Sequence, residues 1–298
     1  MAGVAGNLAA FEFTGLDGVL VAGRDAGGAG SRCGYTAAPT ECVNYVAAHD
    51  NETLYDLVAL KLNGSTEQRV AVLRLAHALV AWSQGIPFFH AGDELCRSKS
   101  LDRDSYKSGD WFNAIDWTGR CECESEYDFG HTFPFNVLPR RTGWGVGLPP
   151  AAKNKDWWPV MKPLLVQPGP TQAQALESAA RLRKLLAVRA SSPLFRLRTL
   201  EDVQARLVFH NCGVDALPAV LVWSLLDDVP FAVCLDARFS RILLAINAQQ
   251  ESVELRDNAW SSITWMTHPE LDTPPGASCA YGRLCLPPLT ATAWVAVR

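Results

Sequence analysis

Residues 43–52 read Val-Asn-Tyr-Val-Ala-Ala-His-Asp-Asn-Glu, an apolar run with β-branched residues that ends in a group of polar side chains. The run predicts a buried strand over residues 43–48, followed by the imidazole of His49, the carboxylate of Asp50 and the amide of Asn51. In a barrel of parallel strands, catalytic and binding groups gather at the C-terminal edge of the strands. We therefore expect a functional site at His49 and Asp50.

A second strand is expected after two helices, and it ends in polar residues in the same way. Residues 53–61 (TLYDLVALK) predict a short helix. Ser65 and Gln68 form a capping box that opens a largely buried helix over residues 66–83. Residues 86–89 (IPFF) predict a short buried strand that leads into a histidine and two acids. Strand, helix and strand in this order predict a βαβ unit with two parallel strands.

The character of the chain changes near residues 195–200. Before this point lie a long irregular region over residues 96–158 and a further helix, which opens at a second capping signature (Thr171 and Gln174) and ends near Ala190. After it, short β-rich runs separated by turn residues predict an all-β sandwich. These runs cover residues 206–210, 219–226, 231–235, 241–247, 263–266, 283–286 and 292–297.

The composition excludes several classes of protein. With 298 residues, 48% of them hydrophobic, the chain can bury a sizeable core. The formal net charge of −4 provides no basic field, so nucleic acid and anionic membranes are poor partners. No apolar run approaches the about 18 to 20 residues of a membrane span. Residues 1–10 are too short and uncharged for a secretory signal.

The chain contains nine cysteines and ten tryptophans. Because nine is odd, at least one thiol is unpaired in a monomer, and the closest pair, Cys121 and Cys123, is too tight for a zinc ribbon. We expect mostly structural thiols in a reducing compartment, no metal site, no cofactor and no indication of calcium. The tryptophans suit either a core or platforms for flat neutral ligands such as sugars, and composition does not decide between these.

The adjacent pair His49 and Asp50 suits several kinds of site. A metal site is disfavoured, because adjacent side chains on a strand point to opposite faces and no partner pair has metal spacing. A Ser-His-Asp triad needs a nucleophile elbow, and the sequence contains no Gly-x-Ser-x-Gly. Two interpretations stay open. One is a glycoside hydrolase site, where such groups hydrogen-bond sugar hydroxyls, and the other is an Asp that only caps a turn.

Long runs of the sequence resemble one family of enzymes. They cover residues 39–54, 83–94, 97–113, 144–150 and 191–197. These runs are similar to limit dextrinases and pullulanase-type starch-debranching enzymes of the α-amylase family, and the resemblance covers nearly the whole chain. It implies the last strands and helices of a (β/α)8 TIM-type barrel in residues 1–196. An antiparallel β-sandwich would follow in residues 197–298.

The resemblance also implies roles for individual residues. Asp50 corresponds to the carboxylate that stabilises the transition state, and His49 donates to the same sugar. Arg103 lies in an Asp-Arg-Asp run that matches the substrate loop of the family. Without the resemblance, the preferred interpretation of Arg103 is a surface salt bridge with Asp102 or Asp104. A later run adds three expected substrate contacts: Asn154, Asp156 and Trp157.

Two departures from the family pattern shape the functional expectation. Residues 119–142 are longer than the corresponding link of the family, which predicts an insertion. The retaining mechanism of the family needs a nucleophilic Asp and an acid/base Glu about 5 Å apart, and we find neither segment in this sequence.

We therefore expect the C-terminal portion of an enzyme that hydrolyses α-1,6-glucosidic linkages in starch, limit dextrin or pullulan by double displacement. The alternative is a non-catalytic remnant that binds glucan or complements a partner chain. The plant-like character of the resemblance implies a plastid, with the cytoplasm as the alternative.

Overall fold

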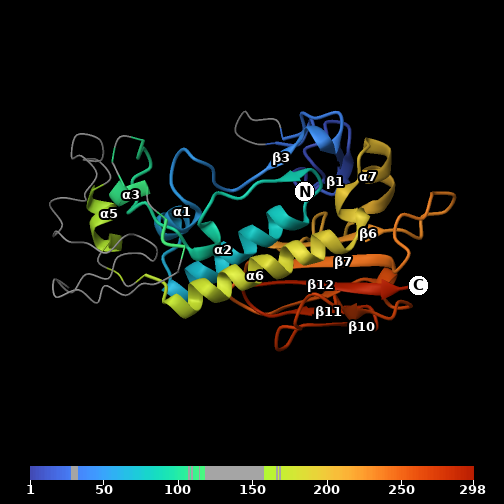
Figure 1. Cartoon of the computed structure of the whole chain (residues 1–298). Helices are drawn as coiled ribbons and strands as arrows, with labels where there is room; N and C mark the ends of the chain where they lie inside the picture. Colours follow the sequence, from blue (N-terminus) through green and yellow to red (C-terminus); the bar gives the residue numbers. More distant parts are fainter. Residues whose placement is uncertain are drawn as a thin grey trace. The chain divides into compact units, whose positions relative to one another are not determined.

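A computed structural model describes residues 1–27, 33–106, 108, 110–113, 115–117, 158–165, 167 and 169–298 (Figure 1). The chain forms two compact units. Unit 1 consists of Met1–Asn44, Leu75–Phe88 and Lys184–Arg298, and unit 2 consists of Tyr45–Arg74 and Phe89–Arg183. The division falls inside two long helices, so each of these helices contributes residues to both units.

Unit 1 is built mainly from β-strands. Its first hairpin pairs β1 (Glu12–Thr14) with β2 (Leu20–Ala22) in antiparallel fashion. Strand β3 (Val43–Asn44) then pairs in parallel with β4 (Ile86–Pro87). This parallel pair confirms the predicted strand–helix–strand unit, because two helices separate β3 from β4 in the sequence.

Both strands of the parallel pair are shorter and more exposed than the sequence predicts. The strand expected over residues 43–48 is confined to Val43–Asn44. Val43 is 45% exposed and Ile86 is 50% exposed. Among the described residues each of these strands pairs only with the other. The described part of the chain shows this two-stranded pair and no closed barrel.

The remaining strands of unit 1 form two antiparallel sheets, drawn in orange and red in Figure 1. One sheet has the order β5-β6-β7-β12-β9 and the other β10-β11-β8. The strands are β5 (Leu207–Phe209), β6 (Val220–Leu226), β7 (Phe239–Asn247), β8 (Val253–Arg256), β9 (Met266–Thr267), β10 (Ser278–Ala280), β11 (Arg283–Leu286) and β12 (Thr290–Val297).

One hydrophobic core joins the two sheets. Val222 and Leu243 of the larger sheet and Leu284 of the smaller one belong to a single buried cluster, together with Trp260 and Trp294. Two antiparallel sheets that share a core in this way form a β-sandwich, as the short β-rich runs predict. On β7 the residues Ile242 to Ile246 are all buried, which is typical of a strand covered on both faces.

Helical segments pack against β6 of the larger sheet. They are η3 (Pro193–Arg196) and α7 (Leu200–Arg206). The sequence analysis did not anticipate α7, although Thr199 has the residue type of an N-cap and its hydroxyl accepts from the backbone NH of Asp202 at 3.1 Å. The short strands β8 and β10 were not anticipated either.

The strand predicted over residues 231–235 is wrong. These residues form a turn and an irregular stretch in which Phe231 has a left-handed backbone (φ 64°) and an exposed side chain. The backbone NH groups of Leu235 and Asp236 donate to the buried carboxylate of Asp227, Leu235 at 2.9 Å. Side-chain acceptors thus satisfy NH groups that a neighbouring strand would otherwise bind.

The three predicted helices form close to their predicted bounds, over residues 54–61, 66–82 and 172–191, and both predicted capping boxes form. Ser65 Oγ accepts from the NH of Gln68, whose side chain accepts in return from the NH of Ser65 at 2.9 Å. Thr171 and Gln174 form the same reciprocal pair. The remaining helical elements are η1 (Pro39–Glu41), α1 (Leu54–Lys61), α2 (Thr66–Trp82), η2 (Asp93–Leu95), α3 (Asp110–Asn113), α5 (Trp158–Leu165), α6 (Gln172–Ser191) and η4 (Asn258–Trp260).

Candidate functional site

The candidate site lies in unit 2, where a bend presents His49 and Asp50 to solvent. Their side chains are 85% and 82% exposed, and His49 Nδ1 lies 3.1 Å from Asp50 Oδ1. The next residue, Asn51, has a left-handed backbone with φ of 64°, a conformation that asparagine tolerates better than most residues. The helix that follows is capped by Thr53, whose hydroxyl accepts from the NH of Asp56 at 3.3 Å. Asp50 caps neither this helix nor a turn among the described residues.

Arg103 reaches this bend from a loop about 50 residues further along the chain. Its Nη2 donates to Asn51 Oδ1 at 3.0 Å, and its Nε lies 3.8 Å from Glu52 Oε1. The structure therefore brings Arg103 to the segment that carries His49 and Asp50. The local salt bridge with Asp102 or Asp104 does not form, because the partners of Arg103 are Asn51 and Glu52.

A buried carboxylate on α1 holds the loop that carries Arg103. Asp56 Oδ1 accepts from the Ser98 hydroxyl at 2.5 Å, and Asp56 Oδ2 accepts from the backbone NH groups of Lys99 at 2.8 Å and Leu101 at 3.2 Å. Burial raises the pKa of Asp56 to about 6, although these donors act in the opposite direction. Asp56 is a structural support of the site that sequence reasoning missed.

A second buried carboxylate near the site is that of Asp93. Its Oδ1 accepts from the NH of Leu54 at 3.3 Å and lies 4.0 Å from His90 Nδ1. Burial raises the pKa of Asp93 to about 7, while burial and the charges of Arg97 and Lys99 lower the pKa of His90 to about 4. His90 Nε2 lies 3.1 Å from Arg97 Nη1. The guanidinium of Arg97 also donates to the carbonyl oxygens of Ala91 and Asn113. Asp93 thus supports the architecture beside α1.

The other predicted substrate contacts fall outside the described residues: Asn154, Asp156 and Trp157. The described residues contain no group of three or more His, Cys, Asp or Glu side chains that could hold a metal ion. The seven described cysteines are all free. In the described part of the chain, no helix is both long enough and apolar enough to cross a membrane.

A Ser-His-Asp chain of hydrogen bonds does occur, but in the sandwich of unit 1. His210 Nδ1 lies 2.8 Å from Asp257 Oδ2, and His210 Nε2 lies 2.7 Å from Ser224 Oγ. Ser224 is 2% exposed and sits within β6, so its hydroxyl is not open to a substrate. The rings of His210 and Trp260 also pack edge to face, with their centroids 5.0 Å apart, so this chain of bonds contributes to the packing of the sandwich.

The bend and the Arg103 loop combine an imidazole, a carboxylate, an amide and a guanidinium, most of them exposed. Planar donors and carboxylates suit the vicinal hydroxyl pairs of sugars, because each can form two parallel hydrogen bonds. These groups do not form a strong metal site, and none of them is a nucleophile on a tight strand-to-helix turn. The arrangement is therefore suited to hold a polar, uncharged ligand by hydrogen bonds.

Comparison with known proteins gives a consistent result. Residues 140–296 match the family described as α-1,6-glucosidases, pullulanase-type, C-terminal. The chain is 40% identical over 242 residues to chloroplastic pullulanase 1 of Arabidopsis thaliana, covering 79% of this chain and 23% of that protein. It is 35% identical over 263 residues to pullulanase of Klebsiella pneumoniae, covering 88% of this chain and 22% of that protein.

Solved structures agree with these relatives. The structure of PulA from Klebsiella oxytoca superposes on the whole chain with a TM-score of 0.86 at 31% identity, which covers 27% of that protein. Pullulanase of Klebsiella pneumoniae complexed with maltotriose gives 0.84 at 30% identity, with coverage of 100% of this chain and 27% of that protein. The chain spans about a quarter of the length of the curated relatives it matches. Since the family match extends over more than half of its residues, the chain belongs to the C-terminal family of pullulanase-type α-1,6-glucosidases.

Proposed function

We propose that this chain takes part in the hydrolysis of α-1,6-glucosidic linkages in α-glucans such as starch, limit dextrin and pullulan. Family membership supports the proposal, as do the relatives, which are pullulanases. A related structure holds maltotriose, a short α-glucan. The parallel pair β3–β4 is consistent with part of a (β/α)8 barrel in residues 1–196, with the sandwich in residues 197–298 as a second domain.

The observation that carries the proposal is the hydrogen bond from Arg103 to Asn51. It links the loop expected to reach substrate with the bend that presents His49 and Asp50. In this proposal, Asp50 accepts hydrogen bonds from the hydroxyls of one glucose and stabilises the oxocarbenium-like transition state. His49 donates to the same sugar, and Arg103 binds the neighbouring one. Asn154, Asp156 and Trp157 remain proposed contacts.

Retaining hydrolysis also needs a nucleophilic carboxylate and an acid/base carboxylate about 5 Å apart. None of the residues assigned here takes either role. The share of the mechanism proposed for this chain is therefore substrate binding and stabilisation of charge. We also propose a plastid location, which the chloroplastic relative supports.

The test is a titration of the purified chain with maltotriose by isothermal calorimetry. Asp50→Asn and Arg103→Gln should each weaken binding by roughly tenfold or more, because a hydrogen bond to a charged group contributes about 1.5 to 3 kcal/mol. Arg183→Gln is a matched control, since Arg183 is exposed and lies outside the site.

A parallel assay of pullulan hydrolysis separates the two candidate roles. Binding with turnover indicates an enzyme, and binding without turnover indicates a glucan-binding chain. If the Asp50 and Arg103 variants bind maltotriose as tightly as the unaltered chain, the assigned site is wrong.

A further inference from the structure

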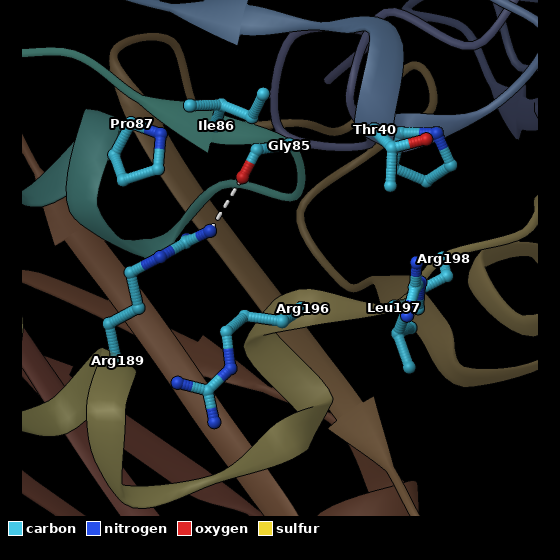
Figure 2. Close-up of a pocket in the computed structure, with 9 residues that line it drawn as sticks. Thr40, Gly85, Ile86, Pro87, Arg189, Arg196, Leu197 and Arg198 are labelled. Atoms are coloured by element: carbon cyan, nitrogen blue, oxygen red, sulfur yellow. Dashed lines mark hydrogen bonds between the residues drawn. The ribbon is translucent and has the colours of Figure 1, made fainter.

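Unit 1 contains a pocket that is separate from the His49–Asp50 bend (Figure 2). Its volume is about 380 Å³, within the range of about 300 to 1,000 Å³ typical of small-molecule sites. Three segments of unit 1 supply its walls, and none of the lining residues is acidic. The lining residues are Pro39, Thr40, Gly85, Ile86, Pro87, Arg189, Arg196, Leu197 and Arg198.

Arg189 forms the fixed base of this cationic pocket. It is 7% exposed, and its guanidinium donates to the carbonyl oxygens of Ala81 at 2.9 Å, Ser83 at 2.6 Å and Gly85 at 2.6 Å. These bonds hold the turn between α2 and β4. Carbonyl oxygens satisfy the donors of Arg189 but do not neutralise its charge. Burial, together with the positive charge of Arg196, lowers the pKa of Arg189 to about 10.

Arg196 and Arg198 add two further charges at the same pocket. Figure 2 shows the Arg189 side chain directed to the carbonyl oxygen of Gly85, the Arg196 side chain on the neighbouring segment, and Arg198 beside Leu197, apart from both. Both Arg196 and Arg198 are exposed, and neither guanidinium has a hydrogen-bond or ion-pair partner in the described part of the chain. The chain as a whole carries a net charge of −4, whereas three arginines and no acidic residue line this pocket.

The positive charge of the pocket favours an anionic ligand. Like charges repel one another, as the effect of Arg196 on the pKa of Arg189 shows, and a bound anion would offset that repulsion. A guanidinium presents a planar fork of N–H donors that matches two oxygens of a phosphate. The hydroxyl of Thr40 is a further exposed donor at the rim. A group with several anionic oxygens fits this set of donors best.

The walls between the arginines are apolar. Pro39, Ile86, Pro87 and Leu197 line the pocket, so it offers contact area to an organic group as well as to a charge. We propose that this pocket binds a phosphate group, either free or as the monoester of a small organic molecule. Arg196 and Arg198 would contact its oxygens, and Arg189 would hold the pocket in shape. The proposal does not depend on the glucan site.

The test compares two ligands on the purified full chain by isothermal calorimetry: inorganic phosphate and phenyl phosphate. We expect saturable binding that weakens as sodium chloride is added, because salt screens the charges. Arg196→Gln and Arg198→Gln should each reduce affinity by about tenfold or more. Arg189 is left unaltered, since its loss would also release the three carbonyl oxygens that it binds.

Arg183→Gln is the matched control, because it removes the same charge from an exposed residue that does not line the pocket. It should bind both ligands as the unaltered chain does. Tighter binding of phenyl phosphate would assign the pocket to a monoester, and equal binding would assign it to free phosphate. Failure of both ligands to bind would overturn the proposal. So would binding that the Arg196 and Arg198 variants retain in full.

Discussion

Replacement of Asp56 by alanine should release the loop that carries Arg103. The buried Asp56 carboxylate accepts from the Ser98 hydroxyl at 2.5 Å and from the NH groups of Lys99 and Leu101 at 2.8 and 3.2 Å. Alanine leaves these donors without an acceptor, and a hydrogen bond to a charged group contributes about 1.5 to 3 kcal/mol. Because such terms do not add fully, we expect the loop to lose about 3 to 5 kcal/mol of local stability.

Hydrogen exchange of single amides measures this effect where it occurs. The amides of Lys99 and Leu101 should exchange roughly 150 to 5,000 times faster in Asp56→Ala, which is the rate equivalent of about 3 to 5 kcal/mol of local stability. The amide of Leu57, bonded to the carbonyl of Thr53 at 2.9 Å within the same unit, is the internal control. It should keep its protection if α1 stays folded.

The matched control variant is Glu177→Ala, which removes a carboxylate of unit 2 whose side chain is 69% exposed. It should leave the exchange of the Lys99 amide unchanged. Asp56→Asn keeps one acceptor oxygen and should fall between alanine and the unaltered chain. If the Lys99 and Leu101 amides exchange at the same rate with and without the carboxylate, Asp56 does not hold the loop and the reasoning is refuted.

Three further predictions concern stability and thiol access. Asp227→Ala should lower the free energy of unfolding of the sandwich by about 3 kcal/mol or more in urea titrations. It removes the nearer carboxylate of the buried Arg206, bonded at 2.6 Å, and leaves only Asp202 at 3.5 Å. The pKa of Asp93, about 7, lies above its value in the unfolded chain, so the folded state binds more protons than the unfolded state. The free energy of unfolding therefore falls as the pH rises from about 4 to about 7. Asp93→Asn should make this dependence on pH less steep in urea titrations at several pH values. Exposed Cys33 should react with a thiol reagent in the native chain, and buried Cys42 should react only on unfolding.

Helix caps and single strands depend on residues that are close in the sequence, so they could be predicted from the sequence. The two capping boxes form because the hydroxyl and the amide side chain that complete each box lie three residues apart. Strand β11 forms over residues 283–286 as predicted, because Gly282 and Pro287 delimit a short run that contains two leucines. The register and partners of the sandwich strands are long-range properties, and the sequence reasoning left them open.

Features that depend on one distant side chain could not be predicted. Residues 231–235 have the composition of a strand, but Asp227 binds the backbone NH of Leu235 and so replaces the partner that a strand would need. Asp56 looks like an ordinary acid in the first turn of a helix. Its role comes from contacts with Ser98 and Leu101, more than 40 residues away in the sequence.

Arg103 shows how sequence proximity can mislead about a site. Its nearest acids are Asp102 and Asp104, which would make it an ordinary surface ion pair. Asp102 is buried, however, and accepts from the Ser108 hydroxyl at 2.6 Å and from the NH of Asp104 at 3.1 Å, so its oxygens are committed inside the loop. The guanidinium turns outward instead and donates to Asn51. The loop's own internal bonds thus set the direction of Arg103.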